Sequence, residues 1–152
     1  MLGLKDLAAI AAEHAAELDA EVRPFDIAGQ INFPSAQPLI MGVINLSADS
    51  WYRESIRTSV ESAVERGNEL RKQGAAIIDI GAESTLGQAQ RVGGEEQRQR
   101  LLPVITELAS QGVIVSAETY DAGVAKTCLE AGAKVLNFTG TADSEAIYRL
   151  AA

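Results

Sequence analysis

One unit recurs four times between Leu39 and Gly140: a short apolar run typical of a buried strand, a small polar cluster at its end, and a helical stretch. In parallel α/β proteins the carboxyl ends of the strands lie at one edge of the sheet. We therefore expect the polar groups at the strand ends to point into one common crevice. The four polar closures are Asn45-Leu46-Ser47, Glu83-Ser84-Thr85, Glu118-Thr119-Tyr120 and Asn137-Phe138-Thr139.

Four such units make half of an eight-stranded (β/α)8 barrel of the TIM-barrel type, which takes roughly 250 residues. The chain has 152 residues. We predict an α/β fold with about the first four βα units of such a barrel, preceded by an N-terminal helix and a hairpin. The predicted domains are the helix at residues 1–22 and the half-barrel at residues 23–152. An open half-barrel exposes strand edges and an apolar face, so we expect a homo-oligomer or a completing second half.

Local signals predict the boundaries of these elements. Apolar residues at helical spacing predict a helix over residues 4–18, and alternation around Ala28-Gly29 predicts a hairpin that could close the bottom of the barrel. A capping box at Thr58 starts the first crossover helix. Glycines at positions 74, 112 and 132 end three helices. The expected strands are 39–44, 76–80, 113–115 and 134–136, and the later helices are 95–110, 121–131 and one that begins near residue 144.

Composition excludes several classes of function. The net charge of −8 disfavours nucleic acid and anionic membranes as partners. A lone Cys128 forbids an intrachain disulfide and a lone His14 forbids a His-rich metal site. The N-terminal segment has neither the apolar core of a signal peptide nor the length of a membrane span. We predict a cytoplasmic protein with no nucleic-acid or membrane partner, in which Cys128 is a core residue.

Several polar residues at the strand ends could bind ligands. The oxygens of Asn45 and of the loop that follows could bind a divalent cation, although Asn and Ser are also common in ordinary turns. Asp79 lies inside an apolar run, where an unpaired carboxylate costs several kcal/mol. A structural partner and a catalytic role for Asp79 both remain open. Ser84 and Thr85 could offer hydroxyl groups to an anion.

Four blocks of sequence carry a resemblance to a known family. They are Ile40–Ser50, Ile77–Thr85, Ser116–Tyr120 and Gly132–Asn137, and they follow one another in unbroken order within a match from about Phe25 to Gly140. Together they resemble the first half of dihydropteroate synthase and of the wider pterin-binding barrel family. Four ordered blocks are far more specific than any single short motif.

The resemblance implies a transferase that joins a pterin pyrophosphate to 4-aminobenzoate in folate biosynthesis, with pyrophosphate leaving in the presence of Mg²⁺. It implies that Asn45 holds the metal or the pyrophosphate, that Thr85 binds the pyrophosphate, and that Glu118 with Asn137 binds the edge of the pterin. The implied catalytic residues are therefore Asn45, Thr85 and Glu118, with Asn45 as metal ligand, and the implied substrate-binding residues are Asp79, Ser84, Thr85, Glu118 and Asn137.

The chain departs from the family pattern at several positions. Ala48 stands where the family has Pro, Glu118 replaces an Asp, and Phe138 replaces another Asp. The first loop continues as Trp51–Ser55 instead of a Ser-Asp-Gly-Gly type sequence, and Leu86-Gly87-Gln88 replaces Arg-Pro-Gly. We expect the 152 residues alone not to turn over substrate, because the family's second half supplies further ligands. Alternatives are a noncatalytic or divergent pterin-binding or assembly module and a relative that transfers methyl groups from a folate.

Overall fold

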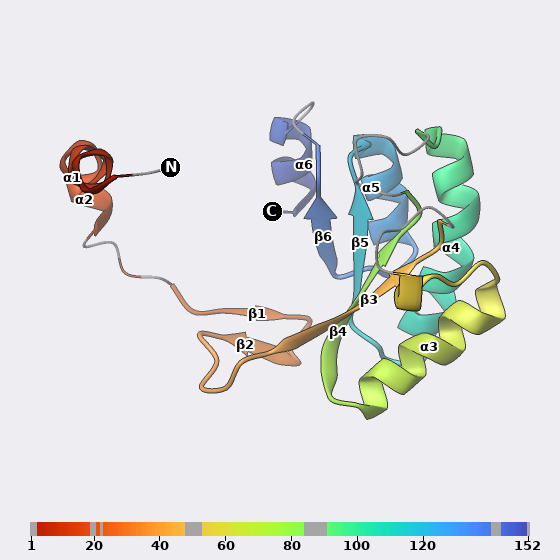
Figure 1. The fold of residues 1–152 in the computed structure, drawn as a ribbon. Helices are drawn as coiled ribbons and strands as arrows, with labels where there is room; N and C mark the ends of the chain where they lie inside the picture. The colour runs from red at the N-terminus through yellow and green to blue at the C-terminus, as the bar shows by residue number, and fades with distance from the viewer. Residues whose placement is uncertain are drawn as a thin grey trace.

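Four apolar runs of the sequence form one parallel sheet in the order β3-β4-β5-β6 (Figure 1). This computed structural model describes residues 3–18, 21, 23–47, 53–83, 91–140 and 144–151. Because the strand order follows the chain order, each unit adds one strand beside the last, as in the first half of a (β/α)8 barrel. The predicted parallel sheet is confirmed. The strands are β3 (Ile40–Asn45), β4 (Ala75–Gly81), β5 (Val115–Thr119) and β6 (Val135–Phe138).

Three helices cover one face of this sheet: α3 (Val60–Lys72), α4 (Gly94–Ser110) and α5 (Ala122–Glu130). Alternate residues of the strands pack against them, since successive side chains of a strand point to opposite faces. Burial raises the pKa of the Cys128 thiol to about 11, consistent with the predicted core role. The fully buried members of this core are Ile44, Ala63, Ile78, Ile80, Leu101, Ile105, Leu108, Val115, Ala117, Val124 and Cys128.

The ends of the helices follow from capping groups. Ser59 caps α3 by accepting a hydrogen bond from the backbone N–H of Ser62, and Asp121 caps α5 in the same way. The prediction that Thr58 starts α3 is therefore wrong by one residue, because the neighbouring serine hydroxyl reaches the free backbone N–H. The predicted helix stops are confirmed, since the glycines at 74, 112 and 132 all have positive φ.

The predicted hairpin is present and lies against the other face of the sheet. Its strands β1 (Phe25–Ile27) and β2 (Ile31–Phe33) are antiparallel. Ala28 and Gly29 between them both have positive φ, as a type I′ turn requires. The hairpin packs at the amino-terminal end of β4 through a second cluster of buried residues, Ile31, Ile77 and Ile114. It therefore covers the bottom of the face that α3, α4 and α5 leave open, as the sequence predicted.

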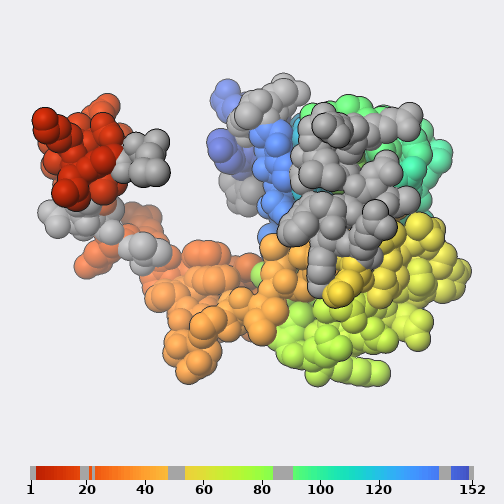
Figure 2. Space-filling model, viewed as in Figure 1, coloured from red at the N-terminus to blue at the C-terminus, as the bar shows by residue number. Residues whose placement is uncertain are grey.

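The N-terminal helix stands apart from the sheet (Figures 1 and 2). The sequence predicted one helix, whereas the structure has α1 (Leu4–Glu13) and α2 (Ala15–Leu18), separated at His14. None of the residues of α1 is buried, and Leu4 is 86% exposed. The apolar stripe that predicted this helix is thus present without a packing partner among the described residues.

The third parallel strand also differs from its predicted bounds. The third parallel strand was expected at residues 113–115 but begins at Val115, because Val113 and Ile114 form the buried connection after Gly112. Pro103 lies inside α4 without dividing it. The remaining elements are the short 3₁₀ helix η1 (Arg53–Ser55) and α6 (Ser144–Ala151), which packs beside α5.

Candidate functional site

A row of polar residues crosses the open face of the sheet near the carboxyl ends of its strands. The strand register places Asn45 beside Gly81, Gly81 beside Glu118, and Glu118 beside Asn137. One row lower, Asp79 of β4 lies beside Ser116 of β5. Residues two apart on a strand share a face, so both rows lie on the face opposite the helices. We call these two rows the inner-face site.

Asp79 and Asn137 form the fixed part of the inner-face site. The Nδ2 amide of Asn137 donates a hydrogen bond of 3.0 Å to Oδ2 of Asp79, which is 3% exposed. That bond directs the amide nitrogen of Asn137 toward Asp79. The other carboxylate oxygen, Asp79 Oδ1, and the hydroxyl of the neighbouring Ser116 are buried, and neither forms a hydrogen bond of good geometry. Burial raises the pKa of Asp79, while the neighbouring Ser116 and Asn137 side chains lower it.

Glu118 has a strongly shifted pKa. Burial, followed by repulsion from Asp79, raises the pKa of Glu118 to about 7. Its carboxylate lies over Gly81, because a Cβ placed on that glycine would meet Glu118 Oε2 at 2.5 Å. The glycine therefore leaves the space that the Glu118 carboxylate occupies.

Asn45 completes the row from the β3 side. Its Nδ2 donates a hydrogen bond of 2.5 Å to the hydroxyl oxygen of Ser55, which is 1% exposed. Its Oδ1 is directed to the other side and lies 3.6 Å from the same Cβ position on Gly81. The segment that carries Ser55 is held against the end of β3 by a bridge between Asn45 and Ile56. Asn45 thus presents an oxygen acceptor to the inner face.

The structure brings together four of the predicted site residues, Asn45, Asp79, Glu118 and Asn137. Ser84 and Thr85, the other two, lie outside the described residues. Sequence reasoning missed Gly81, Ser116 and Ser55. Strand alternation could have placed Ser116 with Glu118, since they are two residues apart on one strand. No local signal connects Ser55 with Asn45, because their contact forms only when the chain returns to β3.

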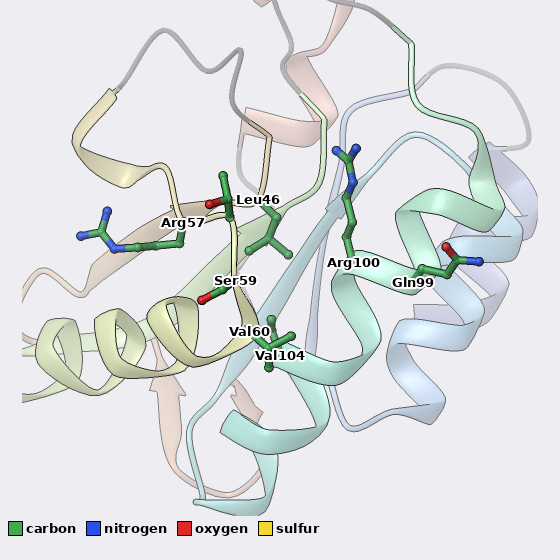
Figure 3. Close-up of a pocket in the computed structure, with 8 residues that line it drawn as sticks. Leu46, Arg57, Ser59, Val60, Gln99, Arg100 and Val104 are labelled. Atoms are coloured by element: carbon green, nitrogen blue, oxygen red, sulfur yellow. The ribbon is translucent and has the colours of Figure 1, made fainter.

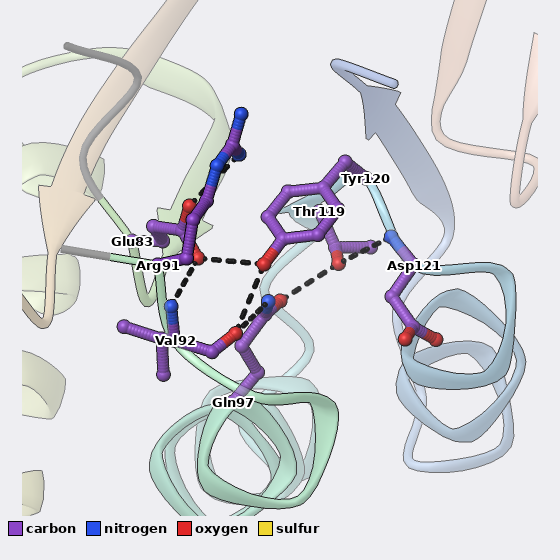
Figure 4. Close-up of polar contacts among 7 residues, drawn as sticks. All are labelled: Glu83, Arg91, Val92, Gln97, Thr119, Tyr120 and Asp121. Atoms are coloured by element: carbon purple, nitrogen blue, oxygen red, sulfur yellow. Dashed lines mark hydrogen bonds and ion pairs between the residues drawn. The ribbon is translucent and has the colours of Figure 1, made fainter. Parts of the chain in front are cut away.

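A second polar cluster lies beyond the ends of β4 and β5 and is centred on Glu83 (Figure 4). Oε2 of Glu83 accepts hydrogen bonds from the backbone N–H of Val92, at 2.7 Å, and from the hydroxyl of Tyr120, at 2.8 Å. Oε1 pairs with Arg91 at 3.0 Å, and the guanidinium of Arg91 lies over the Tyr120 ring. Glu83 therefore connects Arg91 and Val92 to Tyr120 at the end of β5.

The Glu83 cluster continues to α4 through Gln97 and Thr119. Gln97 donates to the carbonyl oxygen of Val92 at 3.0 Å and accepts from the hydroxyl of Thr119 at 2.8 Å. Thr119 follows Glu118 on β5 and so points to the helix side. The expectation that the strand-end groups share one crevice is thus wrong for Glu83, Thr119 and Tyr120. The alternation of the strand and the turn after it send them to this separate cluster.

A pocket of about 370 Å³ lies on the helix side of the sheet, between the start of α3 and α4 (Figure 3). Its two arginines do not converge on a ligand position, since their side chains extend in different directions. Arg57 donates to the carbonyl oxygens of Glu54 and Ile56, and Arg100 donates to that of Ala82 and pairs with Glu96. The lining residues are Leu46, Arg57, Thr58, Ser59, Val60, Gln99, Arg100 and Val104.

Comparison with known proteins decides the family. The sequence model described as pterin binding enzyme matches residues 41–152. The chain belongs to the pterin-binding enzyme family. The dihydropteroate synthase of Bacillus subtilis is 38% identical to it over 100 residues, which cover 65% of this chain and 35% of the relative. The resemblance drawn from the four sequence blocks is therefore confirmed.

Solved structures of the pterin-binding enzyme family share the fold. The dihydropteroate synthase of Yersinia pestis, crystallised with a sulfonamide drug, superposes with a TM-score of 0.74 at 27% identity, covering 86% of this chain and 47% of that chain. The Xanthomonas albilineans enzyme with 4-aminobenzoic acid gives a TM-score of 0.64 at 34% identity, covering 76% and 43%. The chain thus spans less than half the length of these relatives, and it corresponds to part of their barrel.

The described residues contain neither a clustered metal site of charged or thiol side chains nor a membrane-spanning helix. No group of three or more His, Cys, Asp or Glu side chains gathers there in a metal-binding arrangement. Within the same residues, no helix has both the length and the apolar character that crossing a membrane needs.

Proposed function

We propose that this chain forms the pterin-binding half of a transferase of the dihydropteroate synthase type, which joins a pterin pyrophosphate to 4-aminobenzoate in folate biosynthesis. One observation supports this above all: Asp79, Glu118 and Asn137 lie together on the open face of a sheet shared with dihydropteroate synthases. The site is buried or half-buried, rich in oxygen acceptors and located at the carboxyl ends of parallel strands. Ligands bind at this edge in parallel α/β barrels.

The chemistry of the inner-face site suits the edge of a pterin. That edge carries amino and ring N–H donors next to ring acceptors. Asp79 holds the amide nitrogen of Asn137, so the amide oxygen is directed away from that bond and can accept from a ligand N–H. The unpaired Asp79 Oδ1 and the Ser116 hydroxyl lie one row below. We propose that Asn137 binds the pterin and that Asp79 supports Asn137, while a pterin role for Glu118 stays a prediction from the resemblance.

The other end of the row suits a metal and a phosphate group. Asn45 presents an oxygen on the inner face, and hard oxygen ligands are those that Mg²⁺ prefers. When bound, Mg²⁺ would supply charge stabilisation for a leaving pyrophosphate. We propose that Asn45 ligates the metal. Ser84 and Thr85 stay predicted pyrophosphate ligands, since they fall outside the described residues.

The proposal requires a partner for turnover. β3 and β6 are the edges of the four-stranded sheet, and Ile40 and Met41 on β3 are 60% and 45% exposed. Unpaired strand edges with apolar side chains favour pairing with further strands. We propose that a second barrel half or a second copy of the chain supplies them, and that these 152 residues do not turn over substrate alone. The compartment that we predict is still the cytoplasm.

A second candidate function is pterin binding without transfer. The observation that favours it is the position of Glu118, whose carboxylate lies over Gly81 on the side away from Asn137. A site that has moved one of its ligands could retain the pterin and lose the reaction. This candidate is separated from the first by a rate measurement on the chain paired with a complete second half.

Pterin fluorescence tests the proposed function directly. Titration of the chain with 6-hydroxymethylpterin should quench the fluorescence of the pterin at saturation. Asn137→Ala should weaken binding about tenfold or more by removing a hydrogen bond at a half-buried position. Asn32→Ala, at an exposed position of the hairpin, is the matched control and should bind like the parent. Equal binding by Asn137→Ala and the parent, or no binding by either, would refute the proposal.

A further inference from the structure

We propose that Glu118 is a ligand of the divalent cation and shares it with Asn45, in a site over Gly81. The inference rests on the proposed function for its role in pyrophosphate chemistry. It differs from the assignment by resemblance, which places Glu118 at the pterin edge. It concerns the side chains of this chain, where a glutamate stands in place of the family's aspartate.

The first step is the meeting of two oxygens over one glycine. Glu118 Oε2 and Asn45 Oδ1 lie 2.5 Å and 3.6 Å from the position that a Cβ would take on Gly81. Gly81 is the register neighbour of both residues, on the strand between theirs. Both oxygens therefore border the Cβ position of Gly81, and they come from the two strands that flank it. A side chain at position 81 would displace the Glu118 carboxylate from this position.

The second step is that the Asn45 oxygen is held in place. Ser55 is almost fully buried and accepts the hydrogen bond of the Asn45 amide nitrogen. The backbone N–H of Arg57 donates to the backbone oxygen of Asn45 at 2.8 Å, which fixes the segment behind the side chain. The amide can therefore offer its oxygen to the inner face without a change of rotamer. A preorganised ligand loses little conformational entropy on binding.

The third step is the surplus of negative charge and acceptors around this point. Asp79 shares the face with Gly81, is 3% exposed, and has a carboxylate oxygen with no hydrogen-bond partner. Two carboxylates close together in a buried site repel each other, and a cation relieves that repulsion. Mg²⁺ is commonly bound through one or two carboxylates with water and substrate phosphates as its other ligands. The inner-face site offers the carboxylates of Glu118 and Asp79 on the same face of the sheet as the Asn45 oxygen.

Binding of Mn²⁺ to the purified chain tests the inference without any activity measurement. Mn²⁺ takes the same oxygen ligands as Mg²⁺, and its free fraction is measured by electron paramagnetic resonance. Glu118→Gln and Asn45→Ala should each weaken Mn²⁺ binding roughly 10- to 100-fold, since even the outer partners of metal ligands have effects of that size. Glu65→Gln removes the same charge from an exposed position of α3 and should leave the affinity unchanged.

A second variant separates geometry from charge. Gly81→Ala keeps both carboxylates but places a methyl group where Glu118 Oε2 lies, so Mn²⁺ binding should fall by a similar factor. Gly93→Ala is its control, because a Cβ there meets nothing within 4 Å. Circular dichroism confirms that each variant is folded. Unchanged Mn²⁺ affinity in folded Gly81→Ala or Glu118→Gln would overturn the inference.

Pterin titrations in the absence of metal distinguish this inference from the proposed function. Glu118→Gln should bind 6-hydroxymethylpterin within about twofold of the parent if Glu118 serves the cation. Weaker pterin binding together with unchanged Mn²⁺ affinity would return Glu118 to the pterin edge and leave the proposed function standing. If Glu118→Gln loses the Mn²⁺ binding of the parent but the parent itself binds no pterin, the cation site stands and the proposed function is overturned.

Discussion

The Glu83 carboxylate and the carboxylates of Asp79 and Glu118 lie near the same edge of the sheet, buried or half-buried, and they differ in how their oxygens are paired. The Glu83 side chain is 8% exposed, and its two oxygens take a backbone N–H, a phenol and a guanidinium. Asp79 is buried to a similar degree, yet one of its oxygens has no partner. Glu118 nearby has a pKa raised to about 7.

The difference in pairing distinguishes a carboxylate that stabilises the fold from carboxylates that are suited to bind a ligand. A buried charge is tolerated when its hydrogen bonds are satisfied, and is costly when they are not. In the Glu83 cluster the protein supplies the partners itself. In the inner-face site it leaves acceptors unpaired, which costs stability until a ligand with N–H donors or positive charge arrives.

The largest effect that this comparison predicts is a loss of stability in Glu83→Gln. The amide nitrogen of the new side chain would face the Val92 N–H or the Tyr120 hydroxyl, and the charge that attracts Arg91 would be gone. Hydrogen bonds to charged groups contribute about 1.5–3 kcal/mol each, so we expect a loss of roughly 2–4 kcal/mol. Urea unfolding at pH 7 measures it.

The control for Glu83→Gln is Glu96→Gln, which changes the same atoms in a surface ion pair with Arg100. That variant should lose at most about 1 kcal/mol. Equal losses in the two variants would show that the pairing of Glu83 has no special weight, and the comparison between the two groups of carboxylates would fail.

The next predicted effect is a gain in stability, for Glu118→Gln, that depends on pH. Glu118 has a pKa of about 7 in the folded chain against an ordinary 4.5, so the folded state holds a proton that the unfolded state has lost. Stability therefore falls as pH rises from about 4.5 through 7. Glu118→Gln should remove this fall and be more stable than the parent at pH 8, by up to roughly 2–3 kcal/mol.

Urea unfolding of the parent and of Glu118→Gln at pH 5 and pH 8 measures this effect. Glu65→Gln, on an exposed helix surface, should keep the slope of the parent between the two pH values. A Glu118→Gln variant that is less stable than the parent at pH 8 would mean that Glu118 is satisfied within the fold, like Glu83.

Much of the fold could be predicted from the sequence because its signals are local. Apolar runs, the turn at Ala28 and Gly29, and glycines at the helix ends each depend on a few neighbouring residues, and the structure has each of them. The misplaced third strand shows the limit of this reasoning. Val113 and Ile114 are apolar and buried but precede β5, and an apolar run alone cannot tell a buried connection from a strand.

The candidate site could be predicted only in part, because its geometry depends on distant contacts. A buried Asp79 required a partner, but the sequence did not indicate that Asn137, 58 residues later, would donate to it. Likewise Glu83 looked like one more ligand at a strand end. Its partner Tyr120 lies 37 residues away and meets it only in the folded chain.

A smaller loss of stability is expected when the hydrogen bond that holds the Asn45 side chain is removed. Ser55→Ala removes the hydroxyl that accepts from the Asn45 amide, leaving a donor in a buried position. We expect a loss of about 1–2 kcal/mol in urea unfolding, and weaker Mn²⁺ binding because the Asn45 oxygen is no longer held. Ser110→Ala, on the exposed end of α4, is the control. Mn²⁺ affinity that is unchanged in Ser55→Ala would show that Asn45 needs no support.

The smallest effect tests how the charge of Glu83 is shared among its partners. Arg91 pairs with Glu83 and stacks on Tyr120, but its side chain is 77% exposed. Exposed ion pairs contribute about 0–1 kcal/mol, so Arg91→Ala should cost no more than that in urea unfolding. Its effect should shrink further in 0.5 M salt, because salt screens the attraction between exposed charges. If Arg91→Ala instead costs as much as Glu83→Gln, the buried N–H and phenol do not stabilise the carboxylate, and Glu83 depends on an exposed cation.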